Sequence, residues 1–139
     1  MYKAIEALSS GLSVARMRVN VLASNIANAE TTRTDDGDGP YKKRMVVQVA
    51  KPFTDVLDDV TLAKPEVAGV LEDTKAPKLV YQPNHPDAKP DGFVEYPNIN
   101  VVQEMTELMS ASRAYEAAVT AVETTKQMAS KGASIAGRF

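Results

Sequence analysis

Cysteine is absent from this 139-residue chain, which excludes disulfide bonds, thiolate metal sites and cysteine nucleophiles. Histidine occurs once, as His85, in a proline-rich stretch with no serine or cysteine at a spacing typical of a catalytic triad. The seven glycines are scattered and do not form a phosphate-binding loop. Without a clustered nucleophile, base or metal ligand set, the sequence indicates a protein that is not an enzyme and has no metal or other cofactor.

Long apolar runs and strong net charge are also missing. No stretch approaches the roughly 20 apolar residues that span a bilayer, so we expect no membrane span. Arg16 and Arg18 interrupt the N-terminal segment, which argues against a cleavable secretory signal and makes the cytoplasm the default location. The net charge of -2 gives no reason to expect nucleic-acid binding, and the basic trio Lys42, Lys43 and Arg44 is typical of a solvated strand face or turn.

Three aspartates between residues 35 and 38 are the nearest approach to a cation site. Asp35, Asp36 and Asp38 resemble the opening of a calcium loop, which needs oxygen ligands at alternate positions. Pro40 and Tyr41 stand where an oxygen ligand and a glycine are required. A polar turn is therefore the favoured interpretation.

Proline is confined to the middle of the chain, because all eight prolines lie between residues 40 and 97. Proline is strongly unfavourable inside a helix, so this distribution predicts two long terminal helices around a non-helical centre. The fold class is then mainly α with a small β region, in which the terminal helices pair as a coiled coil and flank a β-hairpin and loop segment. We divide the chain into an N-terminal helix (1–30), a central strand and proline-rich loop region (31–98) and a C-terminal helix (99–139).

Both terminal segments carry apolar stripes with alternating spacings of three and four residues, which is the pattern of a coiled-coil seam. The first predicts a helix over residues 3–28, and the second a helix that begins at the capping pair Asn100 and Gln103. The expected assembly seam comprises Leu8, Leu12, Leu22, Ile26, Met105, Leu108, Tyr115, Val119 and Val122.

A second apolar row on the C-terminal segment runs from Ala111 to Met128. Two interpretations remain open: a wide apolar face buried within the monomer, or a face covered by further subunits. A helix over 100–136 would be longer than a compact body of this size, which favours assembly. The carboxylates Glu104, Glu107, Glu116 and Glu123 are interpreted as a solvated or inter-subunit charged face.

Asparagine recurs along the first helix at positions 20, 25 and 28, although it is a mediocre helix former. Either buried amides fix the helix register, or these residues are exposed and Asn28 ends the helix with a left-handed turn. In the centre, β-branched residues predict strands over 41–50, 67–71, 78–81 and 93–96, with a loop over 82–92.

The stretch Asn25-Ile26-Ala27-Asn28-Ala29-Glu30-Thr31-Thr32 resembles the N-terminal signature of flagellar rod, hook and hook-associated proteins. On this resemblance Asn25, Asn28, Ala29, Thr31 and Thr32 are the signature residues. The motifs His85-Pro86-Asp87-Ala88, Tyr96-Pro97-Asn98-Ile99-Asn100 and Ser110-Ala111-Ser112-Arg113-Ala114-Tyr115-Glu116 are similar to the proximal-rod members of that family. The chain departs from the broader pattern where Arg33 to Gly39 separate the two threonines from Pro40-Tyr41.

The resemblance implies a structural subunit of the basal-body rod, the drive shaft that crosses the bacterial periplasm and transmits torque for motility. It implies export by the flagellar type III apparatus and terminal helices that pack with copies of the chain and sibling rod proteins in a helical tube. This implication replaces the cytoplasmic default. The alternative from the pattern alone is a soluble coiled-coil adaptor or export-associated protein that binds one partner through the same seam.

Overall fold

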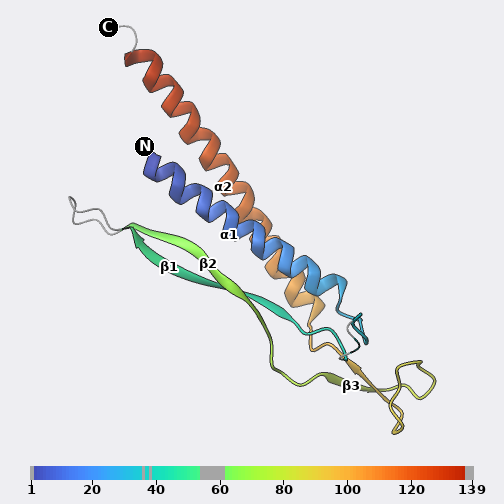
Figure 1. The fold of residues 1–139 in the computed structure, drawn as a ribbon. Coiled ribbons are helices and arrows are strands. Elements are labelled where there is room, and N and C mark those ends of the chain that lie inside the picture. The colour runs from blue at the N-terminus through green and yellow to red at the C-terminus, as the bar shows by residue number, and fades with distance from the viewer. Residues whose placement is uncertain (1, 36, 38, 54–61, 137–139) are drawn as a thin grey trace.

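The computed structural model describes residues 2–35, 37, 39–53 and 62–136. Two long helices, α1 and α2, lie side by side and antiparallel, and the strands follow one another between them in the sequence (Figure 1). The elements are α1 (Tyr2–Ala27), β1 (Arg44–Phe53), β2 (Leu62–Glu72), β3 (Lys78–Tyr81), β4 (Phe93–Tyr96) and α2 (Val101–Ala136). The predicted fold class, long terminal helices with a small antiparallel β region, is confirmed.

The start of α2 is capped at the residue that the sequence predicted. Asn100 Oδ1 accepts a hydrogen bond from the Gln103 backbone N–H at 3.3 Å, and the Asn100 carbonyl accepts one from Glu104 N–H at 3.0 Å. The Gln103 side chain donates to Glu107 instead of returning to the cap, so the capping box is only half formed.

The end of α1 differs from the prediction of a left-handed turn. No non-glycine residue in the described part of the chain has a positive φ, Asn28 included. The Asn28 side chain instead donates through Nδ2 to the Ser24 carbonyl at 2.9 Å, and the same carbonyl accepts the Asn28 backbone N–H at 3.0 Å.

The two helices differ in length, so one passes the other. At 1.5 Å per residue the 36 residues of α2 extend about 54 Å, whereas the 26 residues of α1 extend about 39 Å. Figure 1 shows the C-terminal end of α2 continuing beyond the N-terminus of α1. The last helix thus has nearly the extent expected from the sequence, which was residues 100–136.

Strands β1 and β2 form a long antiparallel ribbon that runs beside α1 (Figure 1). The pairing extends from Arg44 opposite Glu72 to Phe53 opposite Leu62, with an irregularity between Val47 and Gln48. β2 begins five residues earlier than predicted, because a two-stranded ribbon consists of edge strands, which tolerate a proline. Pro65 lies within β2.

The ribbon is attached to α1 by polar contacts as well as by packing. Ser10 Oγ donates to the Pro65 carbonyl, and Lys64 Nζ donates to Glu6 Oε1 at 2.8 Å. The hydrogen bond to the Glu6 carboxylate raises the pKa of Lys64 above its ordinary value.

A second, shorter hairpin joins β3 to β4 over the residues that the sequence predicted. Lys78 pairs with Tyr96 and Tyr81 with Phe93. Val94 is fully buried, while Tyr81 and Phe93 form an edge-to-face pair with ring centroids 5.3 Å apart.

The core is small for a chain of this length. In the described part of the chain the buried apolar residues are Val14, Ala15, Val21, Leu22, Tyr41, Val94, Pro97 and Ala111. Helix α1 contributes four of them because it packs against α2 on one side and against the ribbon on another. Large apolar side chains of α2 remain exposed, namely Val102, Met105, Met109 and Met128.

Candidate functional site

Asn25 is fully buried at the point where α1, α2 and the start of β1 meet. Its Nδ2 donates to the Arg44 carbonyl at 2.8 Å and to Glu104 Oε2 at 2.9 Å. Its Oδ1 accepts from the Arg44 backbone N–H at 2.9 Å and from the Tyr41 hydroxyl at 3.1 Å. Both donors and both acceptor positions of the amide are therefore used, which is the full capacity of an asparagine side chain.

Glu104 is the second fully buried polar residue of this junction. Its Oε1 lies 2.5 Å from Lys43 Nζ, which is the only partner of that oxygen in the described part of the chain. The Lys43 side chain is 19% exposed, so one end of the ion pair reaches water and the other does not. A buried carboxylate is tolerated only where it is paired, so Lys43 and Asn25 together keep Glu104 in place.

Tyr41 completes the group that we call the polar junction, which consists of Asn25, Tyr41, Lys43 and Glu104. Its ring is buried, and its hydroxyl lies 3.3 Å from Ser24 Oγ as well as donating to Asn25. Its backbone N–H donates to the Thr31 carbonyl at 3.1 Å. The junction thus ties the segment that leaves α1 to the segment that enters β1.

The remaining signature residues form the turn after α1. Thr31 Oγ1 donates to Asn28 Oδ1 at 3.2 Å, and the Thr31 backbone N–H donates to the Asn28 carbonyl. Ala29 N–H donates to the Ile26 carbonyl at 3.3 Å. The turn continues through Gly37 and Gly39, whose φ angles of 74° and 98° suit glycine.

Asp87 connects this turn to the loop before β4. Thr32 Oγ1 donates to Asp87 Oδ2 at 2.8 Å, and the Arg33 guanidinium lies 3.8 Å from Asp87 Oδ1. The Asp87 backbone N–H donates to His85 Nδ1 at 3.1 Å, so the single histidine acts as a hydrogen-bond acceptor within a turn. Two motifs that lie 55 residues apart in the sequence therefore meet in the structure.

The predicted seam residues lie on the two long helices, with differing burial. Leu22 is buried, and the others are partly buried except Met105, which is 49% exposed. On α2, buried and partly buried residues recur with spacings of four and three in the series Glu104, Leu108, Ala111, Tyr115, Ala118 and Val122. Met105 lies one position off this series and is more exposed than its members.

Three members of the polar junction were not identified as site residues from the sequence. Tyr41 was assigned only to the predicted strand over 41–50, which begins at Arg44 in the structure. Glu104 was assigned to a solvated or inter-subunit charged face and Lys43 to a solvated basic cluster, yet they form a largely buried pair. One signal could have identified Glu104, because it precedes Leu108 by four residues and so continues the apolar series by one turn. Lys43 carries no comparable signal, because its partner is 61 residues away.

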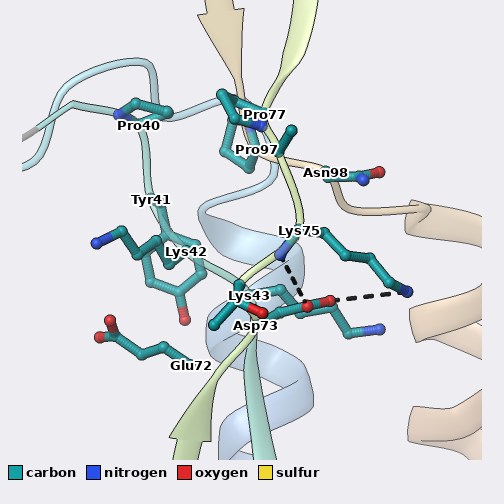
Figure 2. A pocket seen from close by; sticks show the side chains of 12 residues that line it. Pro40, Tyr41, Lys42, Lys43, Glu72, Asp73, Lys75, Pro77, Pro97 and Asn98 are labelled. Carbon is teal, nitrogen blue, oxygen red and sulfur yellow. Dashed lines mark hydrogen bonds and ion pairs between the residues drawn. The ribbon is translucent and has the colours of Figure 1, made fainter.

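A groove of about 450 Å³ lies beside the junction, between the chain before β1 and the chain after β2. Figure 2 shows Pro77 and Pro97 at one end of it and Tyr41 along its wall. Asp73 Oδ1 accepts a hydrogen bond from Lys75 N–H at 3.1 Å, and Asp73 N–H donates to the Lys43 carbonyl at 2.7 Å. The groove is lined mainly by proline, lysine and aliphatic atoms, which form no constellation for group transfer.

Over residues 2–35, 37, 39–53 and 62–136, no three histidine, aspartate or glutamate side chains gather as metal ligands would. Within the same ranges, neither helix is apolar enough over a sufficient length to cross a bilayer. Asp36 and Asp38, which belonged to the calcium-loop comparison, lie outside the described residues.

The structure is thus a helical hairpin that is closed by the polar junction and has the signature turn at the end of its first helix. Residues 5–33 match the sequence family described as flagella basal body rod protein. Residues 91–135 match the family described as flagellar basal body rod FlgEFG protein C-terminal. The class is therefore that of the flagellar basal-body rod proteins.

Individual relatives identify the family within this class. The flagellar basal-body rod protein FlgC of Borreliella burgdorferi is 38% identical, with 92% of each chain covered. FlgC of Bacillus subtilis is 34% identical over 96% of this chain and 97% of its own, and FlgC of Salmonella typhimurium is 41% identical over 86% and 85%. The chain belongs to the FlgC family of flagellar basal-body rod proteins, and the predicted resemblance to proximal-rod proteins is confirmed.

Proposed function

We propose that this chain is a structural subunit of the flagellar basal-body rod and joins other rod subunits through its two terminal helices. The observation that carries the proposal is the exposed apolar surface of α2, together with relatives that are rod proteins along almost the whole chain. Val102, Met109 and Met128 are exposed to 74%, 60% and 64%. Apolar side chains exposed to this degree along one helix are typical of an interaction surface.

The polar junction suits a subunit that carries mechanical load. Asn25 holds α1, α2 and β1 at one point, so a force applied to either helix reaches the ribbon through short hydrogen bonds. All four hydrogen-bonding positions of the buried Asn25 amide are used, which favours one fixed arrangement of these elements. Many such subunits, packed through parallel helix contacts, would form a stiff tube that transmits torque for motility.

Each part of the chain has its own role in this function. Residues 1–30 and 99–139 assemble as coiled-coil helices, and residues 31–98 connect and brace them. The partners are copies of the chain and sibling rod proteins in the periplasmic part of the basal body, after export by the flagellar type III apparatus. The role is structural, without catalysis or a cofactor.

Replacement of Leu108 by aspartate tests the role of the helix contact. Leu108 is partly buried one helical turn after Glu104, so the new carboxylate would be placed on the same side of α2 as an existing buried one. We expect Leu108→Asp to block rod completion while the chain is still synthesised, whereas Ser110→Asp, at an exposed position, leaves the rod intact. Electron microscopy of basal bodies and a motility assay provide the readout. Normal motility of the Leu108→Asp strain would contradict the seam assignment.

The alternative is a soluble coiled-coil adaptor or export-associated protein that uses the same helices to bind one partner. Stoichiometry separates the two functions. A rod subunit is present in several copies in purified basal bodies, whereas an adaptor is absent from them or recovered at a lower level.

A further inference from the structure

Methionine carries all the sulfur of this chain, because the sequence contains six methionines and no cysteine. Five of them lie in the described part of the chain, namely Met17, Met45, Met105, Met109 and Met128, and all five are exposed. Tryptophan is absent as well, so the thioether groups are the most readily oxidised side chains of the protein. A peroxide therefore meets its main targets at the surface of the folded chain.

The core does not depend on these thioethers. Within the described residues the buried apolar positions are occupied by valine, leucine, alanine, proline and one tyrosine. Oxidation of a buried methionine disrupts core packing, whereas an exposed methionine can take up an oxygen atom without displacing a neighbour. Methionine oxidation should thus change the surface of this protein and leave its helices intact.

Two of the five methionines lie together on α2. Met105 and Met109 are four residues apart, which makes them neighbours on one side of the helix, and they are 49% and 60% exposed. Val102, three residues before Met105, extends the same side and is also exposed. We call these three residues the methionine patch. The other methionines lie on α1, on β1 and in the second half of α2.

The methionine patch borders the polar junction but lies on a different side of α2. Successive residues of a helix are about 100° apart around its axis, and Glu104 is fully buried whereas Met105 is half exposed. A sulfoxide on Met105 would therefore be placed on the exposed side of the helix, and the contacts of Glu104 with Lys43 and Asn25 would remain. At this point the outward surface can change without a change in the junction.

We propose that Met105 and Met109 are a modification site, at which hydrogen peroxide converts the two thioethers to sulfoxides and prevents the free subunit from joining the rod. The sulfur attacks one peroxide oxygen, so an S–O bond forms as the O–O bond breaks. The second oxygen leaves as hydroxide and takes up the proton of the first, which yields water. Each sulfur loses two electrons, and each peroxide molecule gains two.

This inference rests on the proposed function, because it concerns the surface through which α2 meets other subunits. A thioether is easily buried, whereas the oxygen of a sulfoxide is a strong acceptor that is unfavourable to bury without a donor. A neighbouring subunit that covers the methionine patch would have to supply donors for two new acceptors. The oxidised chain is then excluded from assembly, whereas an assembled chain has its patch covered and protected. Enzymatic reduction of the sulfoxides restores the thioethers, so the block is reversible.

Peroxide oxidation of the natural chain, followed by peptide mass spectrometry at each methionine, tests the site in three states. They are the purified folded chain, the same chain unfolded in urea, and the chain in purified basal bodies. We expect Met105 and Met109 to be oxidised in the folded chain almost as fast as in urea, with no loss of the helix signal in circular dichroism. In basal bodies we expect their oxidation to be at least several-fold slower than in the folded chain.

Variants in the bacterium that encodes this protein separate polarity from size, because glutamine resembles a methionine sulfoxide in length and polarity. Met105→Gln/Met109→Gln should lower the number of copies per basal body several-fold relative to Met105→Leu/Met109→Leu, which keeps the patch apolar. The matched control Met17→Gln/Met45→Gln adds the same polarity outside the patch, at exposed positions of α1 and β1, and should be incorporated like the natural chain.

The results distinguish a failure of the modification site from a failure of the rod function. If the natural chain is present in basal bodies but Met105 and Met109 are oxidised there as fast as in the free folded chain, the site is wrong while the rod function stands. Unfolding that accompanies their oxidation, equal incorporation of the glutamine and leucine pairs, or an equal loss in the control pair would also overturn the proposal. If the natural chain is absent from basal bodies, both the proposed function and the modification site fail.

Discussion

Removing the ammonium group of Lys43 should destabilise the protein far more than removing the ammonium group of Lys42. Lys43→Met leaves the Glu104 carboxylate fully buried with one remaining donor, Asn25 Nδ2 at 2.9 Å. Breaking a buried ion pair from one side typically reduces the free energy of unfolding by about 3 to 5 kcal/mol. Lys42→Met, at the exposed adjacent position, should change it by no more than about 0.5 kcal/mol.

Because Lys43 is partly exposed and Glu104 is fully buried, replacing Glu104 should destabilise the protein less than replacing Lys43. Glu104→Gln keeps an acceptor for Asn25 and leaves Lys43, which is 19% exposed, able to turn toward water. Its effect should therefore be smaller, about 1.5 to 3 kcal/mol, which is the range for a lost hydrogen bond to a charged group. The double variant Lys43→Met/Glu104→Gln should be more stable than Lys43→Met alone, because no buried charge remains without a partner.

Urea unfolding of the purified full-length chain, followed by circular dichroism at a helix band, measures these differences as shifts of the midpoint. Because the core is small, a stabilising osmolyte added equally to all samples keeps the weaker variants folded. Equal midpoints for Lys43→Met and Lys42→Met would refute the assignment of Glu104 as a buried anion that depends on Lys43. A double variant no more stable than Lys43→Met would refute the charge argument.

Two further predictions follow from the junction and from the β3–β4 hairpin. Asn25→Leu should reduce incorporation into rods more than it reduces helix content, because leucine fills the space but satisfies none of the four polar groups around Asn25; unchanged incorporation would contradict this. Gly92→Ala should lower the free energy of unfolding by about 1 to 3 kcal/mol, because Gly92 has a φ of 79° and a Cβ there would lie 2.7 Å from Tyr81 Cε2. Gly69→Ala, where the space is open, serves as its control in thermal unfolding.

The sequence predicted the elements of this fold well, for reasons that are local. Proline confinement and the apolar stripes located both helices, and Asn100 marked the start of α2 through its own side chain. The short strands β3 and β4 were also predicted, since β-branched and aromatic residues are concentrated there. β2 was predicted too short, because Pro65 is unfavourable in a paired strand interior but is tolerated at a ribbon edge.

The polar junction could be predicted only in part. The open choice for Asn25, between register and exposure, resolves in favour of burial, because the structure brings four polar partners to its amide. The role of Glu104 depends on Lys43 and Asn25, which are 61 and 79 residues away, and no local pattern reports contacts over such distances. A charged residue that continues an apolar stripe can therefore belong to a buried polar network, although its charge alone suggests a solvated position.

Met105 was predicted as a seam residue, but the spacing of apolar residues did not show which face of α2 packs on α1. An alternating three and four spacing fits more than one face of a wide apolar helix, so the stripe through Met105 and the series through Glu104 differ by one position. Only the packing of α1 decides between them, and it leaves Met105 49% exposed for another chain to cover.

Quantitative mass spectrometry of purified hook and basal-body particles tests the central claim most directly. If the chain is a structural rod subunit, it is present in several copies per particle and remains there after washing with high salt, because salt does not weaken contacts made through the exposed apolar residues of α2. Absence from the particles, or recovery below one copy per particle, would contradict the rod function and place the adaptor function first.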